Sequence, residues 1–250
     1  MRLVPQLLRL KLCRKRRKSF TGNRTPATKL WSLATVAVLR SLPVNAITVN
    51  YEDGALEFAN QLFGFQPADT DLAALAGALD GATVQVSIRR TKGWLYLTVN
   101  DHRFERYETS IRKDADGSLF AYIHHVYAAV GYSGQGNGAR AFLRQVNAAR
   151  RLGLKRFELF AAGYPGSIEE NGYYVWGRYG FDAPLSGEEQ RRLPAPLTGA
   201  TTINQLLQRG GLQWWKRFGS FRSMSFDLAD GSEMMNAFLD YLKEKQVIED

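Results

Sequence analysis

Cysteine and histidine are scarce in this chain of 250 residues, and their scarcity limits its chemistry. The only cysteine, Cys13, excludes a disulfide within the chain and a zinc site built from several cysteines. The three histidines (His102, His124 and His125) are too few and too unevenly spaced to predict a metal site. No apolar run reaches the roughly 18 residues that a membrane-spanning helix needs. We therefore expect neither a metal nor a transmembrane segment.

Acidic residues are absent from residues 1–45, which carry 11 Lys and Arg. The remaining 205 residues have 22 basic and 24 acidic side chains, so the net charge of +9 comes from this arm. A near-neutral body argues against a globular nucleic-acid-binding surface, whereas the arm is suited to nucleic acid or anionic lipid. We expect the arm to be disordered. A nucleic-acid or membrane adaptor driven by it is one interpretation of the chain.

A targeting signal is the alternative interpretation of the arm. The apolar run of residues 30–39 precedes Val44-Asn45-Ala46, which resembles the hydrophobic region and cleavage site of a signal peptide. The basic lead is long, however, and Arg40 closes the apolar run. We therefore favour a cytoplasmic protein over an exported one.

The patterning of the body, residues 46–182, predicts a mixed α/β fold, and residues 183–250 form a C-terminal extension packed on it. Asp69 or Thr70 is the expected cap of the second helix, and Ser232 is the expected cap of the last one. The expected strands span residues 47–54, 83–90, 94–100, 103–113, 118–130, 155–162 and 221–228, and the helices span 55–63, 72–79, 139–152, 203–208 and 233–246. Four of these strands form an antiparallel meander with a hairpin turn at residues 114–117. The strand at 155–162 should lie parallel to the one before the helix at 139–152.

Three glycines, Gly134, Gly136 and Gly138, alternate along the chain between the meander and this helix. Glycine lets the backbone turn sharply and approach a ligand closely. The helix start that follows exposes unpaired N–H groups and the positive end of the helix dipole. Together these features form a cradle for an anion, most often phosphate. A turn without a ligand is the simpler alternative.

One candidate for the cradle is a dinucleotide fingerprint. Gly134-x-Gly136-x-x-Ala139 matches its spacing, and Glu158 follows at a suitable distance. Glu158 falls in the middle of an expected strand, however, whereas a ribose-binding carboxylate belongs at a strand's end. The preceding antiparallel meander also differs from parallel βαβ units. A dinucleotide-binding protein is therefore the less favoured interpretation.

The second candidate rests on Gln135-x-x-Gly138-x-Arg140, a following helix that ends in Arg-Leu-Gly-Leu, a strand, and Tyr179-Gly180-Phe181. These motifs follow one another in the order found in the GNAT superfamily of acyl-CoA N-acyltransferases, which residues 83–181 therefore resemble. The resemblance implies a central mixed sheet with a C-terminal strand–helix extension. It also implies transfer of an acyl group, usually acetyl, from acyl-CoA to an amine. The amine would attack the thioester directly, without a covalent enzyme intermediate.

The resemblance also implies where acyl-CoA binds. Its pyrophosphate would lie on the N–H groups of residues 136–139, and its pantetheine arm between the strands at 119–130 and 155–162. The cofactor-binding candidates are Val130, Gln135, Gly136, Asn137, Gly138, Ala139, Arg140 and Asn171. Arg140 replaces a small residue of the family pattern, and its side chain would either clash with the pyrophosphate or pair with it.

A second departure concerns the general acid. Trp176 stands where many members of the family have a tyrosine, and an indole cannot protonate a leaving thiolate. Tyr173 and Tyr174 are the substitute candidates for the acid, and His124 and His125 for the base. Packing and structural roles are the alternatives for all four. Adjacent strand residues face opposite sides, so we expect at most one histidine to line the cleft.

A catalytically inactive GNAT-like binding or regulatory module is therefore the main rival. Trp214, Trp215 and Phe218 lie outside the family core, where they would seal the extension onto the body, wall an acceptor pocket or form an interface. Glu169 and Glu170 are expected to be solvated, although acceptors often bind in this region of the family. The acceptor itself, whether a small amine, an antibiotic, a peptide N-terminus or a protein lysine, is left open.

Overall fold

The computed structural model describes residues 46–167 and 170–248, and every structural statement below concerns these residues. The basic arm, the signal-like segment and Glu169 lie outside them. The strands are β1 (Thr48–Tyr51), β2 (Thr83–Arg89), β3 (Trp94–Asp101), β4 (Phe104–Lys113), β5 (Leu119–Ala128), β6 (Arg156–Ala161) and β7 (Arg222–Asp227). The α-helices are α2 (Ala55–Phe63), α3 (Asp69–Ala76), α4 (Asn137–Arg151), α5 (Gly172–Arg178), α6 (Gly187–Arg191), α7 (Ile203–Gln208), α8 (Leu212–Phe218) and α9 (Glu233–Glu244). Short 3-10 turns are η1 (Arg90–Lys92) and η2 (Ala195–Leu197).

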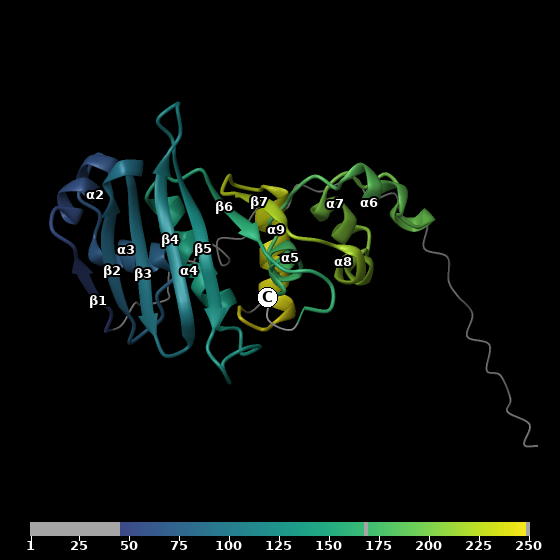
Figure 1. Ribbon diagram of the computed structural model, residues 1–250, viewed down its shortest axis with the longest axis horizontal. Coiled ribbons are helices and arrows are strands. Elements are labelled where there is room, and N and C mark those ends of the chain that lie inside the picture. The colour runs from purple at the N-terminus through teal and green to yellow at the C-terminus, as the bar shows by residue number, and fades with distance from the viewer. Residues whose placement is uncertain (1–45, 168–169, 249–250) are drawn as a thin grey trace, which may run out of the picture. The chain divides into compact units, whose positions relative to one another are not determined.

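The seven strands form one mixed sheet in the order in which they occur along the chain (Figure 1). Strands β2 to β5 are antiparallel neighbours, which confirms the predicted meander. Its hairpin turn is closed by the Gly117 N–H, which donates to the Asp114 carbonyl at 3.0 Å. Strand β6 is parallel to β5, as predicted, and β7 is antiparallel to β6. The chain is therefore a mixed α/β protein whose C-terminal extension contributes an edge strand to the same sheet.

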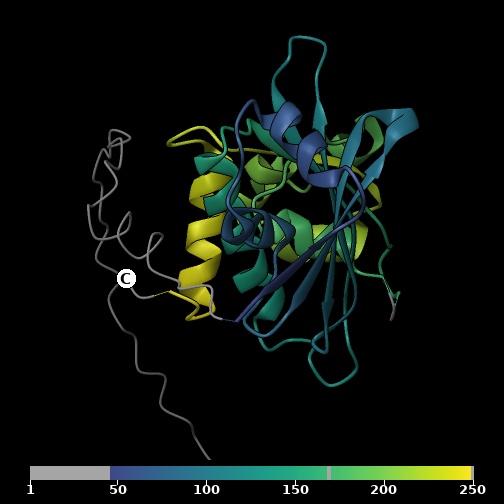
Figure 2. The same cartoon turned by 90° about the vertical axis from the view of Figure 1, so that its left-hand side faces the viewer.

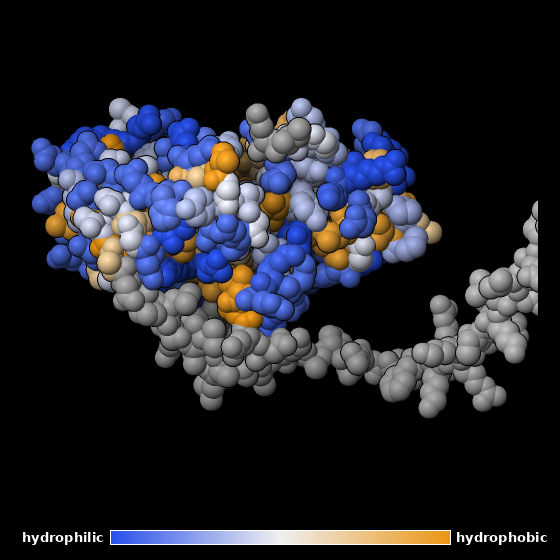
Figure 3. All heavy atoms as spheres, turned by 90° about the horizontal axis from the view of Figure 1, so that it is seen from below, coloured by the Kyte–Doolittle hydropathy of each residue, from blue (hydrophilic) through white to orange (hydrophobic). Residues whose placement is uncertain are grey.

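Helices α2, α3, α4 and α9 pack on one face of the sheet, as Figures 1 and 2 show together. The described helices leave the opposite face of β2 to β5, which is turned toward the viewer in Figure 1, uncovered. Seen from below in Figure 3, the described surface is mostly polar, with apolar residues in small separate patches. The core therefore lies between the sheet and a single helical layer.

Phe142 of α4 is the centre of this core. Its side chain is completely buried, as the helical spacing of Phe142, Val146 and Ala149 predicts. The ring contacts six aromatic side chains from β6, β7, α9 and the chain around α5, with centroids 4.9 to 6.0 Å away: Phe157, Trp176, Tyr179, Phe181, Phe226 and Phe238. One side chain thus joins the helix after the glycine loop to the C-terminal half of the protein.

Gln145, one turn further along α4, adds a buried polar link. Its amide oxygen accepts a hydrogen bond from the Tyr107 hydroxyl at 2.7 Å, and its amide nitrogen donates to Thr109 Oγ1 and the Leu75 carbonyl, each at 3.0 Å. These bonds tie α4 to β4 and α3. Because a buried amide is stable only with its partners satisfied, the network fixes the position of the helix.

The helix caps were predicted with mixed success. Ser232 caps α9 as expected, since its hydroxyl accepts from the Met235 N–H at 3.2 Å. The expected cap of α3 is wrong: the helix begins at Asp69 itself, after Ala68, and has no side-chain cap. The reason is that the Asp69 carboxylate accepts a hydrogen bond from the Tyr51 hydroxyl of β1 instead.

Candidate functional site

Strands β5 and β6 pair over only three residues each. Residues 121–123 of β5 lie opposite residues 157–159 of β6. Strand β5 then continues through Ala128 with β4 as its neighbour, while β6 stays paired with β7 through Ala161. Backbone groups of β5 beyond Ile123 thus have no strand partner on the β6 side. Such groups are available to a ligand that adds hydrogen bonds along a strand edge.

A β-bulge lies where the two strands part. Thr109 pairs with Ile123, but Glu108 pairs with His125, so His124 is an extra residue in β5. The core-facing residues on either side are Ile123 and Val126, and both histidines therefore turn to the uncovered face. Their ring centroids are 6.4 Å apart. The premise that these adjacent histidines face opposite sides of the sheet is wrong, because the bulge interrupts the alternation of side chains.

His124 is held in a cluster of polar and aromatic side chains. Its Nε2 lies 2.9 Å from Ser110 Oγ, and its ring packs on Tyr96 and Tyr122 with centroids 5.1 and 4.9 Å away. Burial, with the adjacent Arg112 guanidinium as a further cause, lowers the pKa of His124 to about 4. The imidazole is therefore neutral at pH 7, and one of its nitrogens is hydrogen-bonded to Ser110. This geometry fits a structural role better than that of a base.

His125 has a different environment. Its ring stacks on Tyr127 at 5.9 Å and lies opposite Glu108 in the ladder. The Glu108 carboxylate in turn accepts hydrogen bonds from Arg106 Nε at 3.0 Å and Arg106 Nη2 at 3.1 Å. Of the two predicted bases, His125 is therefore the one whose ring nitrogens form no hydrogen bond with a described residue.

The glycine loop leads into α4 through backbone that glycine favours. Gly134 and Gly136 have φ values of 78° and 76°, and Gly136 precedes the first helical residue. The helix has neither a side-chain cap nor an acidic residue in its first turn. Among the described residues, the N–H groups of residues 136–139 have no acceptor, since the first helical bond is donated by the Arg140 N–H. The helix start thus presents free donors, as the sequence predicts.

The side chains of the loop fold back on it. Gln135 Nε2 donates to the Gly131 carbonyl at 2.7 Å, and an Arg140 nitrogen donates to the Gln135 carbonyl at 2.7 Å. The same Arg140 nitrogen lies 3.3 Å from Asn137 Oδ1. Val130 is 91% exposed at the start of the loop. Arg140 therefore places an exposed guanidinium beside the free N–H groups, and it pairs with no described carboxylate.

Gly138 and Ala139 serve the packing of the helix. Ala139 is completely buried, and a Cβ at Gly138 would lie 3.3 Å from the Tyr179 hydroxyl. Tyr179 is buried against Phe142 and Tyr241. A larger residue at position 138 would thus require the Tyr179 hydroxyl to move by a few tenths of an ångström from the first turn of α4.

Helix α5 brings the predicted polar residues of the second motif together. Asn171 is exposed and precedes α5, and its side chain does not cap the helix. Tyr173 is buried, and its hydroxyl donates to the Lys216 carbonyl at 2.7 Å. Burial raises the pKa of Tyr173. This hydroxyl is committed to a structural bond, which argues against Tyr173 as the acid.

Tyr174 is half-buried, and its hydroxyl has no hydrogen-bond partner among the described residues. Its ring lies 5.7 Å from both the Arg178 guanidinium carbon and Lys216 Nζ. Tyr174 is therefore the better placed of the two predicted acids. Trp176, in contrast, packs on Phe142 and Phe181 in the core.

The dinucleotide interpretation does not suit this geometry. Glu158 lies in the middle of β6, and its carboxylate accepts from Arg156 Nε at 2.7 Å. The strand before the glycine loop belongs to an antiparallel meander. A carboxylate in an ion pair on the sheet face is not available to a ribose at the strand's end.

Some residues around the site were missed by the sequence analysis. Ser110 and Arg112 contact His124, and Lys216 contacts both Tyr173 and Tyr174. The predicted hairpin turn could have located Ser110 and Arg112. Counting residues from the turn along both strands places Ser110 opposite Tyr122. No comparable signal links Lys216 to α5, because 43 residues separate it from Tyr173.

The fold and site define a mixed α/β protein with a glycine loop between two parallel strands that part. Comparison of the chain with protein-family models, curated proteins and solved structures finds no match. In the described part of the chain, no helix is long and apolar enough to cross a membrane. The same residues contain no group of three or more His, Cys, Asp or Glu side chains arranged for a metal ion.

Proposed function

We propose that the protein transfers an acyl group, with acetyl the first choice, from acyl-CoA to an amine. The observation that carries the proposal is the parting of β5 and β6 directly before a glycine loop and an uncapped helix. A strand edge with free backbone groups suits the pantetheine amides, and the helix start suits the pyrophosphate. The resemblance of residues 83–181 to the GNAT superfamily supplies the chemistry.

The residues present fit such a ligand. The N–H groups of residues 136–139 have no described acceptor, and α4 has no first-turn acid to repel an anion. Arg140 adds a positive charge beside them, which favours the pairing alternative over the clash. Asn171 is exposed directly before α5 and its side chain does not cap the helix, so we assign its amide a contact with the ligand.

When bound, acyl-CoA supplies the thioester carbonyl that the amine attacks. In the transfer, the amine nitrogen forms a bond to the acyl carbon, the carbon–sulfur bond breaks, and the sulfur takes up a proton. We assign the donation of this proton to the Tyr174 hydroxyl, because that of Tyr173 is bound to Lys216. We assign removal of a proton from the amine to His125, because His124 is bound to Ser110.

Thermal unfolding with acetyl-CoA tests the proposal. At 1 mM ligand and a Kd near 10 µM, stabilisation of about 2.7 kcal/mol should raise Tm by several degrees. Gly136→Val should abolish the shift, because it blocks the helix start. Gly117→Val is the matched control: its φ of 85° imposes similar backbone strain in the β4–β5 turn, but the ligand shift should persist. Absence of any shift in the unaltered protein at millimolar acetyl-CoA would overturn the proposal.

A binding module without catalysis is the second candidate, and the core position of Trp176 favours it. The two functions separate in one further assay. A transferase releases free thiol from acetyl-CoA in the presence of amines, and a binding module shows the thermal shift without thiol release.

A further inference from the structure

Aromatic side chains gather on the face of β2 to β5 that the described helices leave uncovered (Figure 1). Leu95 and Leu97 of β3 are completely buried on the core side, so Trp94 and Tyr96, which alternate with them, lie on the uncovered face. The bulge in β5 adds both of its histidines to the same face. We call this surface the aromatic face, and its rings are those of Trp94, Tyr96, Tyr122, His124, His125 and Tyr127.

The rings of the aromatic face form a row in which neighbours are in contact. The centroids of Trp94 and Tyr96 are 6.4 Å apart, Tyr96 stacks on His124 at 5.1 Å, and His125 stacks on Tyr127 at 5.9 Å. Tyr127 is exposed and the other rings are half-buried, so each ring is held by its neighbours while part of it remains accessible. Such a row is a platform on which the planar rings of a ligand stack.

Three cations lie among these rings. The Arg112 guanidinium carbon is 3.7 Å from the centre of the Trp94 ring and 4.0 Å from that of Tyr122. Arg89 and Lys92 are exposed and lie 5.4 and 5.7 Å from rings of β3. None of the three cations forms an ion pair with a described carboxylate. Their positive charge is therefore available to an anionic ligand.

The carboxylates of β4 and β6 on this face are neutralised within it. Glu108 accepts a hydrogen bond from Arg106 Nε at 3.0 Å, and Glu158 accepts one from Arg156 Nε at 2.7 Å. These acids therefore do not balance the three unpaired cations. Although the body of the protein is near neutral as a whole, its aromatic face is locally basic.

Charge discriminates among occupants of the aromatic face. Residues 1–45 carry 11 Lys and Arg and no acid, so this arm is repelled by a basic surface. A second copy of the chain, paired through the same face, would bring unpaired cations opposite unpaired cations. A polyanion that carries planar rings complements both the cations and the aromatic row, and the arm supplies further positive charge for it.

We propose that the aromatic face binds single-stranded nucleic acid. Its bases stack on the rings, and its phosphates pair with Arg89, Lys92 and Arg112. A single strand is favoured over a duplex because only unpaired bases expose their planes for stacking. Four-stranded sheets with exposed aromatic side chains bind single-stranded RNA in this way. The inference goes beyond the proposed transferase and does not rest on it, since it requires neither acyl-CoA nor Tyr174.

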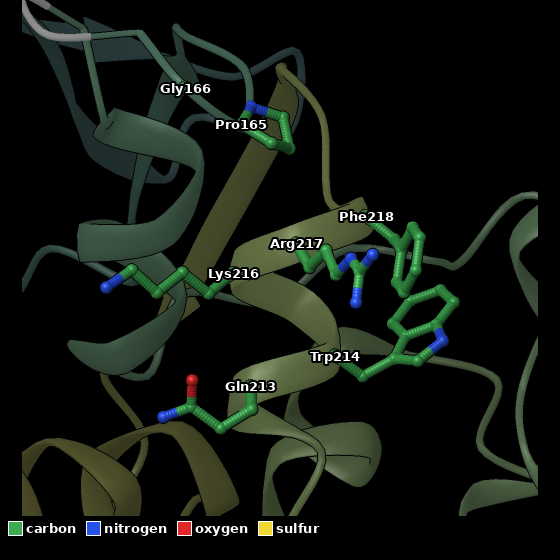
Figure 4. A pocket seen from close by; sticks show the side chains of 7 residues that line it. All are labelled: Pro165, Gly166, Gln213, Trp214, Lys216, Arg217 and Phe218. Carbon is green, nitrogen blue, oxygen red and sulfur yellow. The ribbon is translucent and has the colours of Figure 1, made fainter.

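Helix α8 offers matched control positions outside the aromatic face. Trp214, Arg217 and Phe218 help to line an open hollow of about 700 Å³, and Figure 4 shows the Arg217 side chain beside the two rings, with Lys216 on the other side of the helix. Trp215 is completely buried and donates from Nε1 to a carbonyl of α5 at 3.0 Å, so it seals the C-terminal extension onto the body. Trp214 and Arg217 thus match, in residue type, a ring and a cation of the aromatic face.

Fluorescence anisotropy with labelled oligo(dT) and oligo(U) of about 20 nucleotides tests the proposal on the full chain. Trp94→Leu and Tyr96→Leu keep an apolar side chain but remove the ring, and each should weaken binding by at least about 5-fold. Trp214→Leu, the matched control, should leave the affinity unchanged. A duplex of the same length should bind at least about 10-fold more weakly than the single strands, because its bases are already stacked. Circular dichroism checks that each variant is folded.

The salt dependence of binding tests the cations separately. Arg89→Met and Lys92→Met should each reduce the slope of log affinity against log salt concentration by about 0.7, the contribution of one phosphate contact on a single strand. Arg217→Met is the matched control, and its slope should equal that of the unaltered protein.

Several results would overturn the proposal. These are no binding of either single strand at about 100 µM protein, equal affinity for the duplex, or unchanged affinity in both Trp94→Leu and Tyr96→Leu, which would show that the arm alone carries the binding. A dimer that Trp94→Leu dissociates, or binding to phosphatidylserine vesicles that this variant weakens, would overturn it in favour of a second copy or a membrane if no single strand binds. None of these measurements uses acetyl-CoA, so failure of the transferase leaves this inference intact, and the reverse also holds.

Discussion

The two halves of the sheet differ in how completely their strands pair. From β2 to β5, each strand is matched by its neighbour along most of its length, and the backbone groups are satisfied by the ladder. Between β5 and β6, the pairing covers only three residues of each strand. The first half is thus a scaffold, whereas the second leaves backbone groups for another partner. The proposed ligand site follows from this difference.

The cores under the two halves also differ. The meander is held by aliphatic residues and the Gln145 network, while the β5–β6 junction depends on aromatic rings around Phe142. Contacts with one central ring join α4, β6, β7 and α9, which the short β5–β6 ladder alone would hold weakly. Side-chain packing thus replaces backbone pairing where β5 and β6 part.

The largest expected effect comes from breaking this aromatic centre. Phe142→Ala should lower the free energy of unfolding by about 3–5 kcal/mol, because it removes a fully buried ring and leaves a cavity. Leu97→Ala, at a fully buried position of β3, is the matched change in the meander, with an expected cost of about 2–5 kcal/mol. Urea denaturation measures both.

Hydrogen exchange then distinguishes the halves. In Phe142→Ala, the amides of β6 and β7 should exchange faster than those of β2 to β4, because the junction opens locally. In Leu97→Ala, the amides of β6 and β7 should not exchange faster than those of β2 to β4. Uniform exchange across the sheet in both variants would mean that the two halves do not differ in local stability.

A smaller effect is expected at the proposed acid. Tyr174→Phe should lower kcat for thiol release by about 100-fold with little change in Tm, because it removes a hydroxyl that has no described partner. Tyr173→Phe should leave kcat nearly unchanged. It should lower the free energy of unfolding by about 1 kcal/mol, because the hydrogen bond to the Lys216 carbonyl is lost. Unchanged turnover in Tyr174→Phe would remove the assignment.

The smallest effect concerns His124 at the boundary of the two halves. Its pKa is lowered from 6.5 to about 4 in the folded protein, so between these pH values the unfolded chain binds a proton that the folded one does not. Stability should therefore fall as pH decreases through this window. We expect His124 to contribute roughly 1 kcal/mol of this loss between pH 7 and 5, which is less than the full linkage value because the ring is partly exposed.

Comparison with His124→Gln isolates this contribution from His125, Glu108 and the other groups that titrate nearby. Urea denaturation at pH 7 and pH 5 should show a smaller pH effect in the variant. An equal effect in both proteins would show that the ring titrates normally.

Much of the fold could be predicted from the sequence. Helices α2 and α7 have the predicted bounds, and the meander, its hairpin turn and the parallel β6 were all expected. The glycine loop and its free helix start were also expected. The outward turn of both histidines was not, because the prediction assumed strict alternation of side chains along the strand, which the one-residue bulge at His124 interrupts.

By itself, the sequence determined the type and approximate extent of these elements, because periodicity, capping residues and turn residues act on neighbours along the chain. The tertiary structure decided which tyrosine hydroxyl remains free, where the Arg140 guanidinium lies, and which of Trp214 and Trp215 is buried. Tyr173 and Trp215 meet across 42 residues of sequence. Such contacts arise only when distant segments pack together, and no local pattern encodes them.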